Sequence, residues 1–381
     1  MKKIVFFSNY LNHHQMPLAD AFYELLGDDY AFVATMPVEA EHLKGGVDYS
    51  SRNYCISACQ DSEQKANALR LAREAEVCVF GANSMEYALE RVKQSECGLS
   101  FEFGERWLKR GWINVLSPHL RRWWLNYQRY FRHKPFYKLN ASAFAAADHR
   151  KLHTYEGRCY RWGYFTAVPE KNEVEASLDV STSGIAPTFM WCARFLKWKH
   201  PELPVLMAEK LRQKGHSFVI DFYGSGEEEA STRALASHLG LEDCINFLGA
   251  VPNEQVLQAM RQHDIFLFTS DSNEGWGAVA NESMSQGCVL VGSDAIGSIP
   301  FLVKHRQNGL VFRSCQVDSL VEEAEWLITH PQEMRRMQRA AVSTMQEIWS
   351  PRNAARQFLQ LVGDLENGRE CSVMEGPGSK E

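Results

Sequence analysis

The stretch that decides the fold is Asn273-Glu274-Gly275-Trp276-Gly277-Ala278-Val279-Ala280-Asn281-Glu282. It follows an apolar run at 264–269 and leads into 278–286, where apolar residues recur at near-helical spacing, so its glycines lie at a strand-to-helix junction. Free backbone N–H groups and the helix dipole favour an anion there, and glycine lets a ligand approach the main chain. The sequence therefore predicts a phosphate-binding turn, with Glu274 at its mouth and Glu282 about two helical turns further on.

Two series of short apolar runs alternate with helical patterns along the chain. Such alternation favours a parallel sheet with helices on both faces and ligands beyond the carboxyl ends of the strands. We therefore predict an α/β protein with two doubly wound, Rossmann-like domains. The first series has strands at 4–7, 30–34 and 77–80 and helices near 17–26 and 63–74. The second has strands at 188–193, 218–223, 244–247 and 265–269 and helices near 203–214, 227–239 and 256–261.

Changes in composition set the predicted domain boundaries. Residues 1–167 form the first domain, and 168–187, rich in Pro, Glu, Ser and Thr and without periodicity, are predicted to be a linker. Residues 188–350 form the second domain, and a last helix is predicted within 351–368. The segment 369–381 is polar and free of aromatic residues, so we expect it to be disordered.

Composition narrows the class of protein. The chain has 381 residues and a net charge of -6, enough for two domains and a balance that argues against bulk nucleic-acid binding. Its 10 cysteines are scattered without metal-ligand spacing, which indicates free thiols in a reducing cytosol. The apolar run at 4–7 is a first strand, too short for a signal peptide. No run approaches the roughly 20 apolar residues of a membrane span, so any membrane contact is expected to be peripheral.

The decisive stretch resembles the E-x7-E signature of the retaining, nucleotide-sugar-dependent glycosyltransferases of family 4 (group 1). Three later segments, 287–291, 297–300 and 308–311, are similar to that family's G-x-P-V-I strand, G-G-x-P-E loop and N-G-L-L-V turn, in the same order. The resemblance implies the GT-B fold: an acceptor-binding domain at 1–167, a nucleotide-sugar-binding domain at 188–350, a central cleft, and a helix at 351–368 that crosses back to the first domain.

The resemblance also implies roles for individual residues. Residues 191–199 look like the family's G-R-L-x-x-x-K-G element, which makes Arg194 and Lys199 the pair that grips the diphosphate, with Lys197 competing for the second role. Glu274 would contact the donor sugar and Glu282 the ribose. The remaining donor-binding candidates are Gly275, Trp276, Gly277, Ala278, Val279, Gly224, Gly226 and Val251.

Each of these assignments has a structural alternative. Arg194, Lys197 and Lys199 could be a basic surface cluster at a strand end, Glu274 a helix N-terminal acid, and the glycines of 224–226 a tight turn. The chain also departs from the family's pattern, with Ala193, Phe195, His200, Ser298 and Phe301 at positions where the family usually has Gly, Leu, Gly, Gly and Glu.

His13 and His14 stand in the first strand-end loop, where the family often has two glycines near the diphosphate. They are candidates for hydrogen bonds to phosphate or acceptor, although helix capping or packing would also explain them. No Asp-x-Asp follows a strand and no ligand cluster suggests a divalent metal. We therefore expect no metal and no cofactor beyond the nucleotide-sugar co-substrate.

Residues 106–138 contain nine Lys or Arg, nine aromatic residues and no Asp or Glu. Cations beside Trp and Tyr are typical of interfacial segments. We expect this basic aromatic segment to contact the membrane peripherally, while the alternative is that its aromatics fill a core and its cations face water.

We expect a cytoplasmic enzyme, placed at the inner face of the membrane by the basic aromatic segment. It would be a retaining, metal-independent hexosyltransferase that moves a sugar from a UDP-hexose type of donor to a saccharide or lipid-linked saccharide acceptor in cell-surface glycan biosynthesis. One rival is a non-hydrolysing UDP-sugar epimerase, which needs no acceptor. Another is a catalytically silent sugar-nucleotide-binding partner protein. No nucleic-acid partner is expected, and no G-x-G-x-x-G follows the first strand, which disfavours a dehydrogenase.

Overall fold

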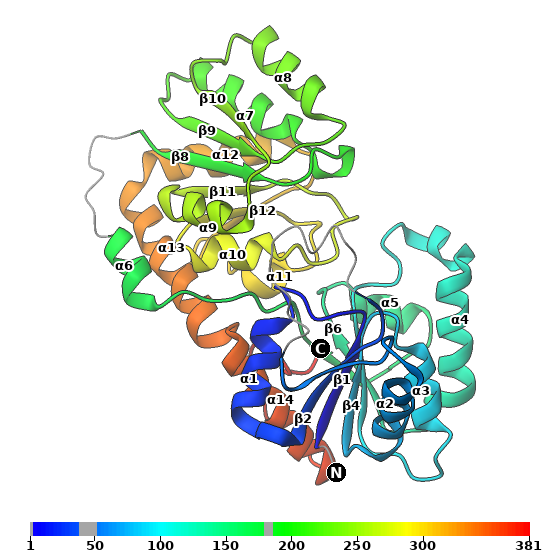
Figure 1. Cartoon of the computed structure of the whole chain (residues 1–381). Coiled ribbons are helices and arrows are strands. Elements are labelled where there is room, and N and C mark those ends of the chain that lie inside the picture. Colours follow the sequence, from blue (N-terminus) through cyan, green and yellow to red (C-terminus); the bar gives the residue numbers. More distant parts are fainter. Residues whose placement is uncertain (1–2, 38–51, 179–185) are drawn as a thin grey trace. The chain divides into compact units, whose positions relative to one another are not determined.

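The computed structural model describes residues 3–37, 52–178 and 186–381, and the chain forms two compact units. The first unit comprises Met1–Ala167 and Ile348–Glu381, and the second comprises Val168–Glu347. Each unit has its own parallel sheet with helices on both faces (Figure 1). The prediction of two doubly wound α/β domains is therefore confirmed.

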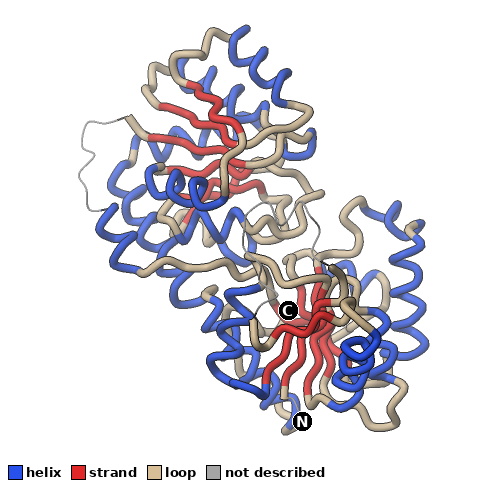
Figure 2. The backbone as a smooth tube through the Cα atoms, in the orientation of Figure 1, coloured by secondary structure: helices blue, strands red, loops and turns tan. Residues whose placement is uncertain are grey.

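Seven strands form the sheet of the first unit, in the order β3-β2-β1-β4-β5-β6-β7, all paired in parallel (Figure 2). The strands are β1 (Ile4–Ser8), β2 (Tyr30–Ala34), β3 (Cys55–Ser57), β4 (Val77–Phe80), β5 (Ser100–Gly104), β6 (Phe136–Asn140) and β7 (Cys159–Arg161). The α-helices of this unit are α1 (Met16–Leu26), α2 (Ser62–Glu74), α3 (Met85–Val92), α4 (Pro118–Asn126), α5 (Ala145–Lys151) and α14 (Pro351–Glu366).

Consecutive side chains of β1 show how both faces of this sheet are covered. Phe7 packs with α2 and α3 in one core cluster, whereas Phe6 lies against Phe22 of α1 and Phe358 of α14, with ring centroids 5.2 and 6.1 Å away. Alternation along a strand sends successive side chains to opposite faces. The helix expected near the C-terminal end, α14, thus closes the second face of the first sheet.

Six strands form the sheet of the second unit, in the order β10-β9-β8-β11-β12-β13. They are β8 (Thr188–Cys192), β9 (Val219–Tyr223), β10 (Ile245–Gly249), β11 (Ile265–Phe268), β12 (Val289–Ser293) and β13 (Gly309–Phe312). The α-helices are α6 (Lys171–Leu178), α7 (Glu202–Gln213), α8 (Glu229–His238), α9 (Asn253–Gln262), α10 (Val279–Ser285), α11 (Ile299–Leu302), α12 (Val317–Thr329) and α13 (Pro331–Ser343).

In each sheet, the strand order changes direction next to the strand that comes first in the sequence. In the first unit the reversal lies between β1 and β4, and in the second between β8 and β11. Connections leave to opposite sides at such a topological switch point, which opens a crevice beyond the carboxyl ends of the two strands. The fold therefore predicts one ligand-binding position in each unit.

Two predicted segments differ in the structure. The stretch 168–187 was expected to be a linker, but it contains α6, where Val174 and Leu178 pack on Val342 of α13. Apolar residues at i and i+4 form one helical face, a signal that the Pro- and Ser-rich composition concealed. The part of this stretch at 179–185 lies outside the described residues.

The expectation that residues 369–381 are disordered is wrong. This C-terminal segment lies along the free edge of β7, where Arg161 N donates to Ser379 O at 2.8 Å and Gly378 N to Arg161 O at 2.7 Å. Ser372 Oγ and N both donate to Asp364 of α14. Backbone hydrogen bonds to an open sheet edge need no aromatic side chain, which is why composition alone gave the wrong result.

Candidate functional site

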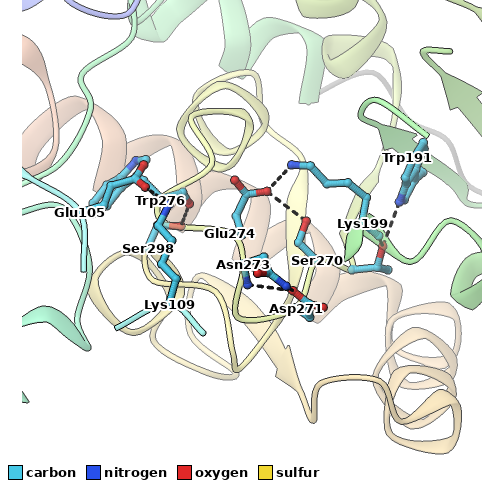
Figure 3. Close-up of polar contacts among 11 residues, drawn as sticks. Glu105, Lys109, Trp191, Lys199, Ser270, Asp271, Asn273, Glu274, Trp276 and Ser298 are labelled. Atoms are coloured by element: carbon cyan, nitrogen blue, oxygen red, sulfur yellow. Dashed lines mark hydrogen bonds and ion pairs between the residues drawn. The ribbon is translucent and has the colours of Figure 1, made fainter. Parts of the chain in front are cut away.

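Two of the predicted donor-binding segments of the second unit meet at the switch point between β8 and β11. These strands are parallel neighbours, so the segments that follow them, 193–200 and 269–278, leave the same edge of the sheet. They bring together Lys199 and Glu274, which are 75 residues apart in the sequence (Figure 3). The fold therefore joins two candidates that the sequence could relate only through a resemblance.

Lys199 and Glu274 form an ion pair between Nζ and Oε2, and the same carboxylate oxygen accepts from Ser270 Oγ at 3.1 Å. Their side chains are only 13% and 11% exposed. The ammonium group also lies 4.3 Å from the centroid of the Trp198 ring. When such a partly desolvated ion pair opens, the cation can bind an anionic ligand group and the carboxylate can accept hydrogen bonds from ligand hydroxyls.

The loop that carries Lys199 is fixed by its neighbours. Thr269 Oγ1 donates to Lys199 O at 2.6 Å and accepts from Trp191 Nε1 at 2.9 Å. Asp271 N donates to Trp198 O at 3.0 Å. His200, which stands where the family usually has Gly, has a φ of 53°, and glycine adopts this left-handed conformation at no steric cost. His200 therefore adopts the left-handed backbone conformation that glycine favours, although the residue differs from the family's pattern.

The predicted phosphate-binding turn approaches β11 closely. Gly277 has a φ of +76°, and a Cβ there would lie 2.2 Å from Phe268 Cζ and 3.2 Å from Glu274 Cδ. Gly275 is buried, and the fully buried Trp276 donates from Nε1 to Asn281 Oδ1 at 2.8 Å. Ser298 Oγ donates to Trp276 O at 2.6 Å. Only glycine fits at position 277, and the rest of the turn is anchored by hydrogen bonds.

Helix α10 is shorter than the spacing of apolar residues predicts. It runs from Val279 to Ser285, with Ala278 as its N-cap residue, instead of spanning 278–286. Seven residues give a small dipole, so fixed side-chain cations become the larger source of positive charge at this position.

Glu282 is a buried acid on α10. It is 8% exposed, accepts from Asn253 Nδ2 at 3.3 Å, and burial raises the pKa of its carboxyl to about 7. A carboxylate without a cationic partner in the described part of the chain retains capacity to accept hydrogen bonds from hydroxyl groups.

Arg194 and Lys197 follow β8 and are both exposed. Among the described residues neither side chain has a hydrogen bond or ion pair, so the guanidinium of Arg194 is available to an anion. Among the described residues Lys197 forms no ion pair with Glu274, whose partner is Lys199. Of the two lysines that competed in the sequence, Lys199 therefore lies at the site.

Gly224 and Gly226 pack closely against the backbone of the loop that carries Arg194. A Cβ at Gly224 would lie 2.0 Å from Ala193 O, and one at Gly226 would lie 2.6 Å from Phe195 O. Phe195 N in turn donates to Ser225 O at 3.0 Å. The glycines thus permit close backbone packing around position 194, while Val251, another donor-binding candidate, is half-buried between β10 and α9.

His13 and His14 belong to the first unit, in the loop between β1 and α1. Their ring centroids are 3.7 Å apart, and burial, with a smaller contribution from His13, lowers the pKa of His14 to about 3. His14 Nδ1 has no hydrogen-bond partner in the described part of the chain. A neutral, buried imidazole offers no charge to a phosphate, which leaves the exposed His13 as the better candidate for an anion.

Sequence reasoning missed four residues that build the site: Asn253, Phe268, Ser270 and Ser298. Ser270 lies four residues before Glu274, a spacing that carries no signal outside a helix. Among residues 3–37, 52–178 and 186–381, no group of three or more His, Cys, Asp or Glu could hold a metal ion. No helix in those ranges is both long and apolar enough to cross a bilayer.

Comparison with known proteins places this site in a class. Residues 183–344 match the family model described as glycosyl transferases group 1. That match spans the second unit from before β8 to the end of α13 and includes every donor-site candidate named above. The second unit is therefore similar to the glycosyl transferases of group 1 over most of its length.

Particular relatives agree with this class. The chain is 26% identical over 122 residues to an uncharacterized glycosyltransferase of Haemophilus influenzae. It is 32% identical over 104 residues to the amylovoran biosynthesis glycosyltransferase AmsK of Erwinia amylovora. These matches cover 32% and 26% of this chain. They span only 34% and 25% of the relatives' own lengths.

Solved structures resemble the chain over nearly its whole length. Anabaena HepE in complex with UDP has a TM-score of 0.68 at 15% identity, covering 96% of this chain and 100% of that one. A glycosyltransferase from Rickettsia africae has a TM-score of 0.66 at 11% identity, covering 96% and 99%. At such identities the likeness shows the fold, which is the two-domain GT-B fold.

Proposed function

We propose that the chain is a retaining, metal-independent glycosyltransferase of family 4 that moves a hexose from a UDP-sugar to a saccharide acceptor in cell-surface glycan biosynthesis. The observation that carries this proposal is the Lys199–Glu274 ion pair at the switch point of the second unit. The family match to 183–344 and the UDP complex of the structural relative HepE support it.

The bond between the anomeric carbon and the diphosphate oxygen breaks, and its electron pair stays on the departing diphosphate. Arg194 and Lys199 stabilise this charge, the first as a planar fork and the second as a point charge. When Lys199 turns to the phosphate, Glu274 is released to accept from a hydroxyl of the donor sugar. The acceptor oxygen attacks the same face of the anomeric carbon and yields its proton to the leaving phosphate, so configuration is retained without a protein nucleophile.

Glu282 completes the donor site by accepting from the ribose hydroxyls. Its carboxyl is buried and free of cationic partners in the described part of the chain, so it can receive two hydroxyl donors. Lys199 and Arg194 supply positive charge from the protein side chains. We infer from their presence that the diphosphate is neutralised without a divalent ion.

A nucleotide-sugar panel tests the proposal. Full-length protein is incubated with UDP-glucose, UDP-galactose, UDP-N-acetylglucosamine and a GDP-sugar in EDTA, with and without saccharide acceptors, and products are followed by proton NMR. We expect consumption of one UDP-sugar, accelerated by acceptor, and a product with the donor's anomeric configuration. A new UDP-sugar formed without acceptor would indicate an epimerase, and binding without any turnover would indicate a silent partner protein. Inversion, or turnover only after a divalent metal is added, would contradict the mechanism.

The basic aromatic segment supports a place at the membrane. Its aromatics divide, because Trp123, Tyr127, Phe131 and Phe136 are buried in the core of the first unit, whereas Trp112, Trp124 and Tyr130 are 64%, 38% and 42% exposed. The alternative that the aromatics fill a core is thus confirmed for the four buried residues, and membrane contact stays a prediction that the exposed residues support. The exposed aromatics lie on η4 (Gly111–Leu116), a 3₁₀ helix, on α4, and on η5 (Tyr127–Phe131), a π-helix.

We call the solvent-facing side of 110–132 the basic apolar face. It consists of Arg110, Trp112, Ile113, Leu116, Arg121, Arg122, Trp124, Leu125, Arg129, Tyr130 and Arg132, all exposed. Exposed Trp and aliphatic residues among arginines, without an acid, suit anionic lipid headgroups. We propose that this face holds the enzyme peripherally on the cytoplasmic side of the membrane, where it meets a lipid-linked acceptor.

A further inference from the structure

The first unit has a groove at its own switch point. It lies beyond the carboxyl ends of β1, β4 and β5, encloses about 570 Å³, and is lined among others by Ser8, Gly81, Glu102, Gly104 and Trp107. Its volume falls within the roughly 300–1,000 Å³ of ligand pockets. Both its position and its size make it a binding site for a small molecule.

Glu102, which lines this groove, forms a buried ion pair with Lys138 behind the lining. Glu102 of β5 and Lys138 of β6 are directly opposite each other across the strands, with Nζ 2.8 Å from Oε1 and side chains 7% and 0% exposed. The other carboxylate oxygen accepts from the hydroxyl of the fully buried Tyr155 at 2.7 Å. Burying two charges costs as much as or more than their attraction returns, so stability does not explain this pair.

The ammonium of Lys138 is also incompletely satisfied. Its contact with Glu102 lacks hydrogen-bond geometry, and Nζ has no hydrogen-bond partner in the part of the chain that the structure describes. A fully buried ammonium has three N–H donors, and leaving them unmade is expensive. The ammonium of Lys138 can therefore donate to an acceptor atom of a bound ligand.

Gly104 leaves the pair open to the groove. A Cβ at this position would lie 3.2 Å from Lys138 Nζ and 3.9 Å from Glu102 Oε1. Gly104 is the last residue of β5 and is absent from the positive-φ residues, so the backbone does not require glycine there. The missing side chain leaves space for a ligand group beside the carboxylate of Glu102 and next to the buried ammonium of Lys138.

We propose that Glu102 and Lys138, reached over Gly104, bind a hydroxyl group of a neutral sugar at the acceptor end that enters the groove. A hydroxyl can donate to the carboxylate and accept from the ammonium at once, which an anion cannot do. Glu105, which also lines the groove, is paired with Lys109 and therefore adds no net charge there. Trp107 offers an aromatic wall beside the pair. This inference rests on the proposed glycosyl transfer and names the class of its acceptor.

Two variants of the full-length chain test the subsite. Gly104→Ala covers the pair without changing a charge, and Glu102→Leu combined with Lys138→Met replaces the pair by apolar groups of similar size, which is expected to preserve the fold. Glu86→Gln is the matched control, because Glu86 lines the groove but is 57% exposed in a pair with Lys65.

Binding is measured by saturation-transfer NMR and titration with methyl glucoside, galactoside, mannoside and N-acetylglucosaminide, each against methyl glucuronide. We expect at least one neutral glycoside to bind the natural chain and the control, to bind both site variants at least tenfold more weakly, and to bind more tightly than the glucuronide. Unchanged binding in Gly104→Ala, a preference for the glucuronide, or no neutral glycoside bound by the natural chain would overturn the subsite.

UDP is titrated into the same samples to separate the two proposals. If UDP binding persists in all variants while glycoside binding falls, the acceptor subsite stands beside an intact donor site. If glycosides behave as expected but UDP does not bind the natural chain, the subsite stands and the proposed transfer fails.

Discussion

Nζ of Lys199 and Oε2 of Glu274 are in direct contact across the switch point of the second sheet. Each is the other's only ion-pair partner among the described residues, and both are nearly buried. In the proposed donor complex, the diphosphate would compete with Glu274 for Lys199, and a hydroxyl of the donor sugar would compete with Lys199 for Glu274. Binding of a nucleotide sugar would therefore exchange one protein ion pair for two contacts with the ligand.

Replacing either member of this pair should impair transfer. We expect Lys199→Met and Glu274→Gln each to lower kcat/KM by about 10²-fold or more, the range for removing one electrostatic contact to the transition state. Lys197→Met is the matched control, because Lys197 is exposed and lies only two residues away. Initial rates measure the effect, with the donor that the nucleotide-sugar panel identifies. A loss in Lys197→Met equal to that in Lys199→Met would refute the assignment.

Glu282 should make stability and nucleotide affinity depend on pH. Burial raises the pKa of its carboxyl from 4.5 to about 7, so the folded state holds a proton that the unfolded state has released between these values. Ionisation of this buried carboxyl destabilises the fold, so its contribution to the free energy of unfolding is most favourable below pH 4.5, where it is protonated in both states. That contribution is lost as pH rises from 4.5 through 7, by about 3 kcal/mol in total.

Urea unfolding of the natural chain and Glu282→Gln at several pH values measures this difference. We expect the variant to gain stability relative to the natural chain as pH rises through this window, and to bind UDP more weakly. In the natural chain UDP affinity should increase as pH passes about 7, because the ionised carboxylate accepts from ribose. A constant stability difference across the window would show that Glu282 is not the buried acid of this description.

Gly277→Ala should harm both the fold and the site. The added methyl group meets Phe268 at 2.2 Å in a backbone with φ of +76°, and strain and overpacking each cost on the order of 1–3 kcal/mol. Gly215→Ala separates the two effects, since Gly215 has a φ of +86° but nothing within 4 Å of its Cβ position. Chemical denaturation and UDP titration should show a larger loss for position 277, and equal losses would exclude the steric clash.

The basic apolar face should bind anionic membranes. We expect the natural chain to float with phosphatidylglycerol vesicles and not with neutral phosphatidylcholine vesicles, and to be released by high salt. Trp112→Ser with Leu116→Ser, and Arg121→Glu with Arg129→Glu, should each reduce flotation severalfold, because all four side chains are exposed. Undiminished flotation of both double variants would place the membrane contact elsewhere.

Removing residues 369–381 should destabilise the first unit. The deletion exposes the edge of β7 and the hydrogen-bonding groups of Arg161, and it uncovers the surface beneath Val373, which is 5% exposed. We expect a lower Tm in thermal unfolding and unchanged UDP affinity, since the donor site is in the second unit. An unchanged Tm would mean that the segment does not pack on the sheet in solution.

Periodicity predicted β1, β2, β4, β8, β9, β10 and β11. β11 is apolar throughout, and such runs are typical of a parallel sheet. Periodicity missed β3 and β7, which have three residues each and are too short for a pattern, and it missed β5 and β6, where Glu102 and Lys138 interrupt the apolar run. It also failed for the C-terminal segment, whose place depends on backbone hydrogen bonds to a distant strand.

The candidate site was predictable where a local pattern carries the chemistry. Gly277 and Glu282 lie in one short motif, and their turn and helix follow from it. The pairing of Lys199 with Glu274 depends on β8 and β11 becoming neighbours, and that of Glu102 with Lys138 on the register of β5 and β6. Long-range strand order is not written in spacing along the chain. The sequence therefore indicated Lys199 and Glu274 only as separate candidates, and it indicated neither Glu102 nor Lys138 as a binding residue.

The measurement closest to the central claim compares uridine, UMP and UDP by calorimetric titration in EDTA, in the natural chain and in Arg194→Ala and Lys199→Met. The account predicts that the natural chain binds UDP at least tenfold more tightly than UMP, and that each variant loses most of this difference while uridine binding stays unchanged. Equal affinities for UMP and UDP in the natural chain, or variants that keep the full preference for UDP, would contradict it.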